Sequence, residues 1–546
     1  MTPQGLASET WSPPPPDSAL TLPGILDFQL THSPDHVAYV YEDADGTLVR
    51  ILYRQFIGTV YKACAAILRD VEFFQKTQDG KAVVAVFANT DSLTYSMLVT
   101  AIMRAGFTPF CISPRSAAPS LANLLRQTKP VAIYVAGEAA KQELARTWEL
   151  LESTDSRIRV FTPPTFDELQ DLDAVEQGAL PQVKTESGDA TALILHSSGS
   201  TSIFTKPVYI SHTLLLNGYA LRPWTGAEDY CGKTISFHAT PNFHGIGVFA
   251  YTWPFTSGIT IAVFNPEIQL PAAPETALAA IRSTNSDIVL ATPMYIEASF
   301  PVNHLLRLTL HRTFVGAALN KRVGDLLVKN KVPLCSYYGS METGILVPFF
   351  QSHGVDWEYI TLSPGLDYTL VPEEEGGLFS LVFFPTDRFA PCWTNLTLDE
   401  RAGCHLSDLF EAHPDPDKAK AGLIRLHGRK DDQINLSTGA KMNPVPTELQ
   451  IMRHHDVEYA VVFGVGKPSP GVLIQLKSGL VPSAELMDGI WVTISELNQS
   501  SPTHFRISRS LVLLSDPGRP FSLSSKGVPR RRVVYQDYEK DIEAAY

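Results

Sequence analysis

A run of hydroxyl side chains between two apolar segments is the part of this sequence best suited to chemistry. It follows the apolar residues 192–195 and consists of Ser197, Ser198, Gly199, Ser200, Thr201 and Ser202, with Lys206 shortly after. Hydroxyl groups, accessible backbone N–H groups and an ammonium group suit a polyphosphate, because donors and a cation meet its spread negative charge. The segment lacks the Gly-Lys-Ser/Thr ending of a Walker A loop. These residues alone leave two interpretations open, a phosphate-binding loop and a polar turn between strands.

The segments before this loop alternate between predicted strands and helices. Residues 82–87, 108–112 and 131–135 read as strands, with predicted helices at 92–105 and 120–127 between them. This β-α-β alternation predicts a parallel sheet flanked by helices. Binding loops should then lie at the carboxyl ends of the strands, where the hydroxyl-rich loop is found.

Later strands also lead into loops of small or polar residues. Residues 234–239 precede PNFHGIG, 308–315 precede GAAL, and 333–337 precede YGSMETG, while 259–264 form a further predicted strand. From about 359 to 426, short strands with turn signals indicate a more β-rich subdomain. A small α+β module is predicted to follow up to the last residue.

Composition places the chain among ordinary globular proteins. Its 546 residues are too many for one core, and 44% hydrophobic with 18% charged residues is typical of globular domains. A net charge of -13 argues against nucleic acid and anionic membranes as partners. The six cysteines are scattered, and neither a membrane-spanning stretch nor a signal-peptide layout is present. We therefore expect reduced, mostly buried thiols and a cytoplasmic enzyme.

Five segments now combine into a pattern. They are HSSGSTSIFTKPV, YYGSMETG, HLSDLF, GRKDDQINLSTGAKMNPVPTE and SSKGVPRRR. In this order they resemble the phosphate loop, the Tyr-Gly-x-Thr-Glu motif, the Thr-Gly-Asp motif, the hinge motif and the catalytic-lysine motif of the adenylate-forming superfamily. That superfamily comprises acyl-CoA synthetases, peptide-synthetase adenylation domains and relatives of firefly luciferase. The NPVP stretch and the ending are most similar to fungal peptide-synthetase-like carboxylic acid reductases, whose adenylation, carrier and reductase domains follow in that order.

The resemblance implies that the chain uses ATP and Mg²⁺, and it gives the reacting end of the site to four residues. Lys526 would bridge the substrate carboxylate and the α-phosphate, and Lys206 would lie near the other phosphates. His244 would lie beside the substrate carboxylate, and Glu342 would bind Mg²⁺, because a hard cation prefers carboxylate oxygen. The alternative for Glu342 is a carboxylate at a helix N-terminus.

At the nucleotide end, the resemblance implies that Tyr338 lies along the adenine, Asp408 accepts hydrogen bonds from the ribose hydroxyls and Arg429 reaches the ribose. The alternative for Asp408 is a turn aspartate. The other residues that the resemblance places at the nucleotide are Ser197, Ser198, Gly199, Ser200, Thr201, Gly316, Ala317, Ala318, Tyr337, Gly339, Ser340 and Met341.

Some positions depart from the family pattern or carry two interpretations. Ser202 and Ser407 stand where the family usually has glycine, and Met341 stands where it usually has threonine. Lys526 and the arginines after it could instead form a solvated basic face. The arginines could also dock an acidic carrier domain. They are Arg530, Arg531 and Arg532.

The predicted fold is α/β: a large N-terminal domain of parallel-type sheets with flanking helices plus a β-rich subdomain, and a small mobile C-terminal α+β domain. We expect an irregular leader at 1–21, an adenylation core domain at 22–428, a hinge at 429–432 and the small domain at 433–546. By resemblance, Asp431 is the pivot about which the small domain rotates between an adenylating and a thioester-forming state.

The predicted function is ATP-dependent activation of a carboxylic acid to an acyl adenylate, then transfer to the phosphopantetheine thiol of a carrier domain before a reductase domain acts. PNFHGIG has no aspartate to pair an α-ammonium group, so we expect an acid without an amino group, with an aryl acid favoured, and a monomeric protein. Two alternatives remain: a free-standing acyl- or aryl-CoA ligase, and a module that binds a nucleotide or acyl adenylate without turnover.

Overall fold

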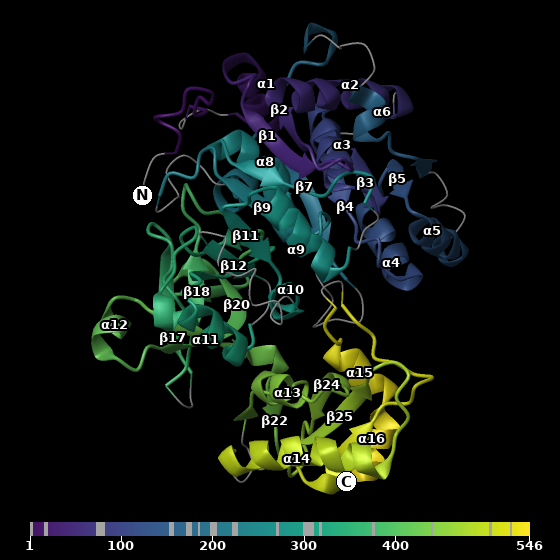
Figure 1. The fold of residues 1–546 in the computed structure, drawn as a ribbon, viewed down its shortest axis with the longest axis vertical. Coiled ribbons are helices and arrows are strands. Elements are labelled where there is room, and N and C mark those ends of the chain that lie inside the picture. Colours follow the sequence, from purple (N-terminus) through teal and green to yellow (C-terminus); the bar gives the residue numbers. More distant parts are fainter. Residues whose placement is uncertain are drawn as a thin grey trace.

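The computed structural model describes residues 4–15, 20–71, 82–151, 158–170, 177–183, 186–196, 205–220, 228–268, 272–298, 311–315, 319–373, 377–437, 441–501, 505–524 and 527–546. A large body built from the N-terminal and central segments lies above a smaller body formed by the C-terminal segment (Figure 1). Among the helices of these ranges, none combines the length and the hydropathy that a bilayer-spanning segment requires.

The first sheet of the large body has six strands in the order β6-β5-β3-β4-β7-β8. Its strands are β3 (Val83–Ala88), β4 (Thr108–Cys111), β5 (Ala132–Ala136), β6 (Arg159–Phe161), β7 (Thr191–His196) and β8 (Pro207–Ser211). All neighbours pair in parallel except β7 and β8, which are antiparallel. The helices α3 (Ser92–Arg104), α4 (Ala118–Thr128) and α5 (Glu138–Leu150) connect or follow these strands. The predicted β-α-β alternation is therefore confirmed here.

A second sheet has seven strands in the order β13-β12-β11-β9-β10-β1-β2. Its strands are β1 (Val37–Glu42), β2 (Leu48–Leu52), β9 (Thr234–Ala239), β10 (Thr260–Ala262), β11 (Ile288–Ala291), β12 (His311–Val315) and β13 (Leu334–Tyr337). Only the β1–β2 pair is antiparallel. The strand predicted at 259–264 is shorter than expected, because only three of its residues pair with β9.

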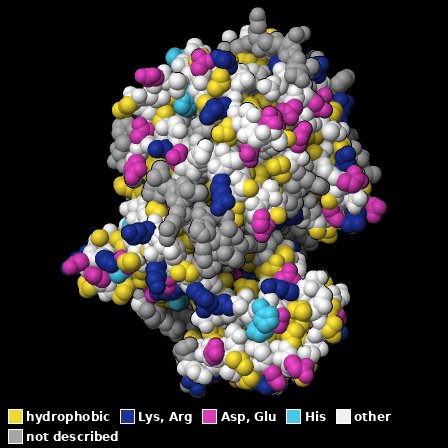
Figure 2. Space-filling view, in the orientation of Figure 1, with side chains coloured by type: hydrophobic (Ala, Val, Ile, Leu, Met, Phe, Trp, Pro, Cys, Tyr) yellow, Lys and Arg dark blue, Asp and Glu magenta, His cyan; other side chains and the backbone are white. Residues whose placement is uncertain are grey.

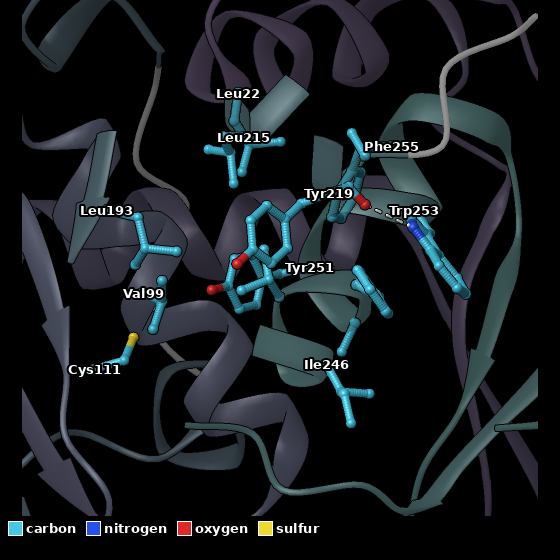
Figure 3. Packing of buried hydrophobic residues seen from close by; sticks show 14 of the residues in the cluster. Leu22, Val99, Cys111, Leu193, Leu215, Tyr219, Ile246, Tyr251, Trp253 and Phe255 are labelled. Carbon is cyan, nitrogen blue, oxygen red and sulfur yellow. Dashed lines mark hydrogen bonds between the residues drawn. The ribbon is translucent and has the colours of Figure 1, made fainter. Parts of the chain in front are cut away.

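One hydrophobic core joins the two sheets through helices α3 and α8 (Val248–Ser257). Tyr219 and Tyr251 lie between Val99 and Cys111 on one side and Trp253 on the other (Figure 3). The indole N–H of Trp253 donates to the Tyr219 carbonyl at 2.9 Å. The leader forms neither helix nor strand in its described residues, yet Trp11 is buried in this core.

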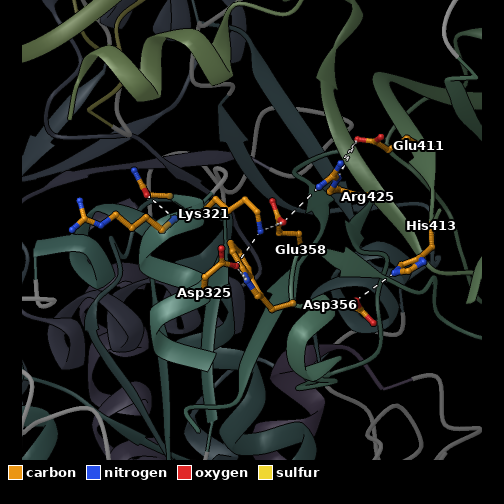
Figure 4. Close-up of polar contacts among 10 residues, drawn as sticks. Lys321, Asp325, Asp356, Glu358, Glu411, His413 and Arg425 are labelled. Atoms are coloured by element: carbon orange, nitrogen blue, oxygen red, sulfur yellow. Dashed lines mark hydrogen bonds and ion pairs between the residues drawn. The ribbon is translucent and has the colours of Figure 1, made fainter. Parts of the chain in front are cut away.

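A five-stranded antiparallel array, β16-β21-β20-β18-β17, forms the β-rich part of the large body, with β19 paired to β20. Its strands are β16 (Tyr359–Ile360), β17 (Asp367–Pro372), β18 (Phe379–Phe384), β19 (Leu396–Leu398), β20 (Arg401–Ala412) and β21 (Ile424–Arg429). Ion pairs join it to helix α11 (Lys321–Lys329) of the second sheet: Lys321 contacts Glu358, and Glu358 contacts Arg425 (Figure 4). This network ties the β-rich part to the second sheet.

The C-terminal body begins after the 3₁₀ turn η7 (Lys430–Asp432) and has its own hydrophobic cores on both sides of a three-stranded sheet. Its elements are β22 (Ile434–Asn435), β23 (Lys441–Met442), α13 (Val445–Ile451), β24 (Val457–Phe463), β25 (Gly471–Leu476), α14 (Ala484–Ser500), β26 (Val512–Leu514), α15 (Arg531–Asp537) and α16 (Glu539–Ala545). The sheet order is β24-β25-β26. Helix α15 lies on the side of this body that faces the large body (Figure 1).

Candidate active site

Tyr338 and Asp408, 70 residues apart in the sequence, meet where the second sheet adjoins the β-rich part. The Tyr338 hydroxyl donates to Asp408 Oδ2 at 2.6 Å, and its ring packs edge-on against Phe410 at 5.1 Å between centroids. Burial first, and then the Asp408 carboxylate, raise the pKa of Tyr338 well above its ordinary value. The phenol therefore stays protonated and remains a hydrogen-bond donor to Asp408.

Asp408 also faces Arg429 across the β20–β21 ladder, where the two are register partners. The β18–β20 register shifts between Ser380 and Val382, so β20 bulges opposite this point. Ser407, in the bulge, has a φ of 61°, a left-handed conformation that favours glycine. A bulge re-aims side chains, and here it brings Asp408 toward Tyr338. Asp408 therefore lies within a strand, and the alternative of a turn aspartate is wrong.

The YYGSMETG segment forms a very short hairpin that pairs β14 (Gly339–Ser340) with β15 (Gly344–Ile345). Gly344 has a φ of 67°, and a Cβ there would lie 2.4 Å from the Gly218 carbonyl oxygen, so only glycine fits. The tip of the hairpin is held from both sides. The Tyr219 hydroxyl donates to the Met341 carbonyl at 2.8 Å, and the Cys392 N–H donates to the Glu342 carbonyl at 2.8 Å.

Glu342 lies at the tip of this hairpin rather than at the start of a helix, so the helix-dipole alternative is wrong. Its carboxylate is half-buried, and no described basic side chain forms an ion pair with it. Burial first, and then the charge of Glu342, raise the pKa of the Cys392 and Cys404 thiols to about 12. A half-buried carboxylate without a cationic partner among the described residues fits a bound Mg²⁺.

His244 lies in the turn that follows β9, directly before the 3₁₀ turn η5 (Gly245–Gly247). The Gly247 N–H donates to the His244 carbonyl at 2.8 Å. A Cβ on Gly245 would lie 3.4 Å from Met341 Cγ, so this turn packs against the tip of the Glu342 hairpin. The structure therefore brings the half-buried His244 and Glu342 to the same part of the molecule.

Lys206 lies directly before β8, and His196 closes β7. His196 and Pro207 are register partners, so these two residues, which flank the hydroxyl-rich segment in the sequence, lie side by side in the sheet. His196 is buried, and its Nε2 accepts from the Ser113 N–H at 2.9 Å. It therefore packs beside the ends of this segment.

Several predicted site residues lie outside the described residues, and the structure places none of them. They are Ser197, Ser198, Gly199, Ser200, Thr201, Ser202, Gly316, Ala317, Ala318 and Lys526. Of the others, Tyr337 ends β13 and packs its ring against Phe349 and Phe350 in the core. Gly339, Ser340 and Met341 belong to the hairpin described above.

Asp431 lies in η7, the short connection between the two bodies. Next to it, Lys430 forms an ion pair with Glu373 of the large body at 2.7 Å. The Asn443 side chain, which comes after the connection in the sequence, donates to the carbonyl of His427, which comes before it. A Cβ on Gly428, whose φ is 154°, would lie 2.7 Å from Asn443 Nδ2. Sequence reasoning placed Asn443 in a family motif but did not foresee this contact, because its partner lies on β21.

The expectation of a solvated basic face is wrong for Arg531. Its guanidinium is largely buried and forms a bidentate pair with Glu448 of α13. Arg532 is exposed, and burial lowers the pKa of Arg530.

Lys and Arg side chains gather along the border between the two bodies (Figure 2). Such a border suits polyanionic ATP.

AMP-binding enzymes match residues 26–379, and the AMP-binding enzyme C-terminal domain matches residues 431–546. The adenylate-forming reductase Nps10 of Heterobasidion annosum is 33% identical over 97% of this chain and 50% of that protein. An adenylate-forming reductase of Aspergillus terreus is 25% identical over 98% of this chain and 50% of that protein. The chain thus spans about half the length of these curated relatives.

Solved structures share the fold. The adenylation domain of a carboxylate reductase from Mycobacterium chelonae superposes with a TM-score of 0.71 at 16% identity, covering 97% of this chain and 92% of that one. The corresponding domain from Segniliparus rugosus, solved with AMP and a co-purified carboxylic acid, also gives 0.71, at 14% identity over 97% and 95% of the two chains. The chain belongs to the AMP-binding enzyme family and is an adenylate-forming domain, which confirms the predicted family and fold class.

Proposed function

We propose that this chain activates a carboxylic acid without an α-amino group, in particular an aryl acid, and then passes it to the phosphopantetheine thiol of a carrier domain as the first step of carboxylic acid reduction. The observation that carries the proposal is the convergence of the Tyr338–Asp408–Arg429 corner, the Glu342 hairpin and the His244 turn. Its relatives named adenylate-forming reductases support the reduction step.

In the proposed reaction, a carboxylate oxygen attacks the α-phosphorus of ATP, the bond to the bridging oxygen of the β-phosphate breaks, and pyrophosphate leaves. Asp408 would accept hydrogen bonds from the ribose hydroxyls, while Tyr338 and Arg429 would hold the Asp408 carboxylate in place. Lys206 and the hydroxyl-rich loop would hold the outgoing phosphates, and Lys526 would meet the charge that concentrates at the α-phosphate. Mg²⁺ bound at Glu342 would neutralise phosphate charge.

The substrate class rests on the His244 turn. PNFHGIG contains no carboxylate that could pair with an α-ammonium group. An anthranilate CoA ligase in complex with anthranoyl-AMP is among the solved structures of this fold, so the fold accommodates an aryl adenylate in that protein. An acid without an α-ammonium group, such as a benzoic or cinnamic acid, therefore suits this turn better than an amino acid.

The test is pyrophosphate release by the purified chain with ATP, Mg²⁺ and a panel of benzoic, cinnamic, aliphatic and amino acids. We expect release with an aryl or alkyl acid and little with phenylalanine. Clear preference for phenylalanine over cinnamate would refute the substrate class. Absence of release with every acid, together with tight AMP binding, would favour a binding module without turnover. Efficient thioester formation with free coenzyme A would instead favour a CoA ligase.

A second experiment separates the two half-reactions. Lys526→Ala should lower adenylation by about 10²–10³-fold, because one preorganised contact to the transition state is lost. Thioester formation from a presynthesised acyl adenylate should persist, since rotation carries Lys526 away. Asp431→Pro should do the opposite, because proline fixes φ at about -65° and should stall the pivot. Equal loss of both steps in Lys526→Ala, or unimpaired transfer in Asp431→Pro, would show that these roles are wrong.

A further inference from the structure

Helix α15 lies on the side of the small body that faces the large body (Figure 1). A buried polar network lies at the first residue of this helix, Arg531. Arg531 donates two hydrogen bonds to the Glu448 carboxylate, from Nη1 at 2.5 Å and from Nη2 at 2.8 Å. Glu448 Oε1 also accepts from the Val462 N–H at 2.7 Å. The Val462 carbonyl accepts from Arg531 at 3.1 Å and from the Tyr535 hydroxyl at 2.6 Å. The network therefore joins α13, β24 and α15 at one point.

This pair differs from the other ion pairs of the small body. The side chains of Arg531 and Glu448 are 15% and 10% exposed, whereas those of Arg509 and Asp488 are 56% and 62% exposed. Burial acts to lower the pKa of Arg531, but the Glu448 carboxylate outweighs it, so the guanidinium stays charged. A buried pair is a poor source of net stability, because desolvation opposes its attraction, whereas it does fix a geometry.

The geometry that it fixes belongs to the segment that contains Lys526. The described residues on either side of 525–526 pair back on each other. The Arg530 N–H donates to the Ser522 carbonyl at 2.8 Å, and the Ser524 N–H donates to the Val528 carbonyl at 2.8 Å. Leu523 and Pro529 form a bridge between the two legs. Residues 522–524 and 528–530 thus form two paired legs, the outgoing and returning legs of what is here called the hairpin, and the returning leg leads directly into Arg531.

The outgoing leg is anchored independently of Arg531. Phe521 is buried, its N–H donates to Gln475 Oε1 at 2.6 Å, and its ring packs edge-on against Tyr538. The base of the hairpin is therefore held on one side by Phe521 and on the other by the charged network. Of these two anchors, the Arg531–Glu448 network is the one that is charged, buried and directly adjacent to the returning leg.

We propose that Arg531 is a positioning residue: held by Glu448 and Val462, it fixes the base of the hairpin so that the Lys526 ammonium meets the reacting phosphate in one place. The inference rests on the proposed function, since it assumes that Lys526 serves adenylation. Misplacing a catalytic group by about 1 Å can cost about 10²-fold in rate. Loss of the network should therefore act on the rate of adenylation and leave nucleotide affinity alone.

The experiment compares Arg531→Met, Arg531→Lys and Tyr535→Phe with the control Arg532→Met, whose side chain is exposed on the same helix. Acid-dependent ATP–pyrophosphate exchange gives kcat, and calorimetry gives the Kd of AMP. We expect Arg531→Met to lower kcat by about 10²-fold with the Kd of AMP unchanged. Arg531→Lys should recover part of the loss, Tyr535→Phe should cost only a few-fold, and Arg532→Met should match the wild type.

A double-variant comparison distinguishes positioning from general damage. In a Lys526→Ala background, Arg531→Met should have little further effect, because the group that it positions is already gone. Additive losses, a weakened affinity for AMP, or an unchanged kcat in Arg531→Met would overturn the inference while leaving the proposed function intact. If Arg531→Met does not fold, an unchanged kcat in both Arg531→Lys and Tyr535→Phe would overturn it. A wild-type chain that exchanges with no acid would overturn the proposed function, and the inference with it.

Discussion

Two acid–arginine pairs lie across the same two strands, β20 and β21, and the structure uses them differently. Asp408 faces Arg429, and Glu411 faces Arg425. Glu411 Oε1 accepts from Arg425 at 2.9 Å, and Arg425 also contacts Glu358, which belongs to the network that reaches α11 (Figure 4). Asp408 instead meets the buried Tyr338 hydroxyl beside the hairpin of Glu342. Two acid–arginine pairs of the same ladder therefore differ in role. One pair helps to attach the β-rich part to α11, and the other belongs to the candidate nucleotide site.

The backbone explains this difference. Between the two acids the β20–β21 ladder shifts register at Leu409 and Phe410, and Ser407, directly before Asp408, is left-handed. A regular strand would place Asp408 and Glu411 on opposite faces, because side chains alternate. Opposite faces meet different neighbours, and the bulge at Ser407 in addition brings Asp408 toward Tyr338. The lesson is that a cross-strand pair acquires its role from the elements that its strands meet, and substitutions at the two ends of this ladder should separate the two roles.

The largest effect should come from Asp408→Asn. The substitution keeps the size of the side chain and removes the charge that would accept the ribose hydroxyls, and hydrogen bonds to charged groups contribute about 1.5–3 kcal/mol. The Kd of AMP should rise about 10- to 100-fold in calorimetry. An unchanged Kd would show that Asp408 is as structural as Glu411.

Ser407→Gly should have the next largest effect, on stability rather than binding. A non-glycine residue in the left-handed region is disfavoured by about 1 kcal/mol, and glycine removes that strain. The free energy of unfolding should rise by about 0.5–1 kcal/mol in denaturant titrations, with the Kd of AMP retained. A loss of stability would mean that the Ser407 side chain itself supports the bulge.

Glu411→Gln is the matched control for Asp408→Asn. The pair is half-exposed, with both side chains 32% exposed, and such pairs contribute about 0.2–1 kcal/mol. The free energy of unfolding should decrease by an amount in that range, and the Kd of AMP should stay at the wild-type value. Weaker AMP binding in this variant would remove the distinction between the two pairs.

The smallest effect concerns Asp356, which accepts a hydrogen bond from Lys418 at 2.5 Å. Lys418 belongs to the segment that connects β20 and β21. Hydrogen bonding to Lys418 is the main cause that lowers the pKa of Asp356 below 3.8. Because the folded pKa is lowered, the stabilisation is present above pH 3.8 and is lost as the pH falls through the folded value. Wild type and Asp356→Asn should differ slightly in unfolding free energy at pH 5–6 and converge below pH 3.8. A difference independent of pH would contradict this assignment.

The amino-acid sequence by itself determined the family, the order of strands and the polar loops at their ends. Apolar runs such as 234–239 and 333–337 specify buried strands locally, and the short motifs between them need only their own residues to be identified. The strand at 259–264 was predicted too long because apolar residues continue beyond the three that pair with β9. Periodicity reports burial but not where pairing ends.

Only the tertiary structure decided which charged residues act together. Nothing local marks Asp408 as the partner of Tyr338, 70 residues away, or Glu448 as the partner of Arg531, 83 residues away. In the sequence, Arg531 is indistinguishable from the exposed Arg532. A charge is solvated or paired according to which distant elements pack around it, and the cost of burying it unpaired makes that packing decide its role.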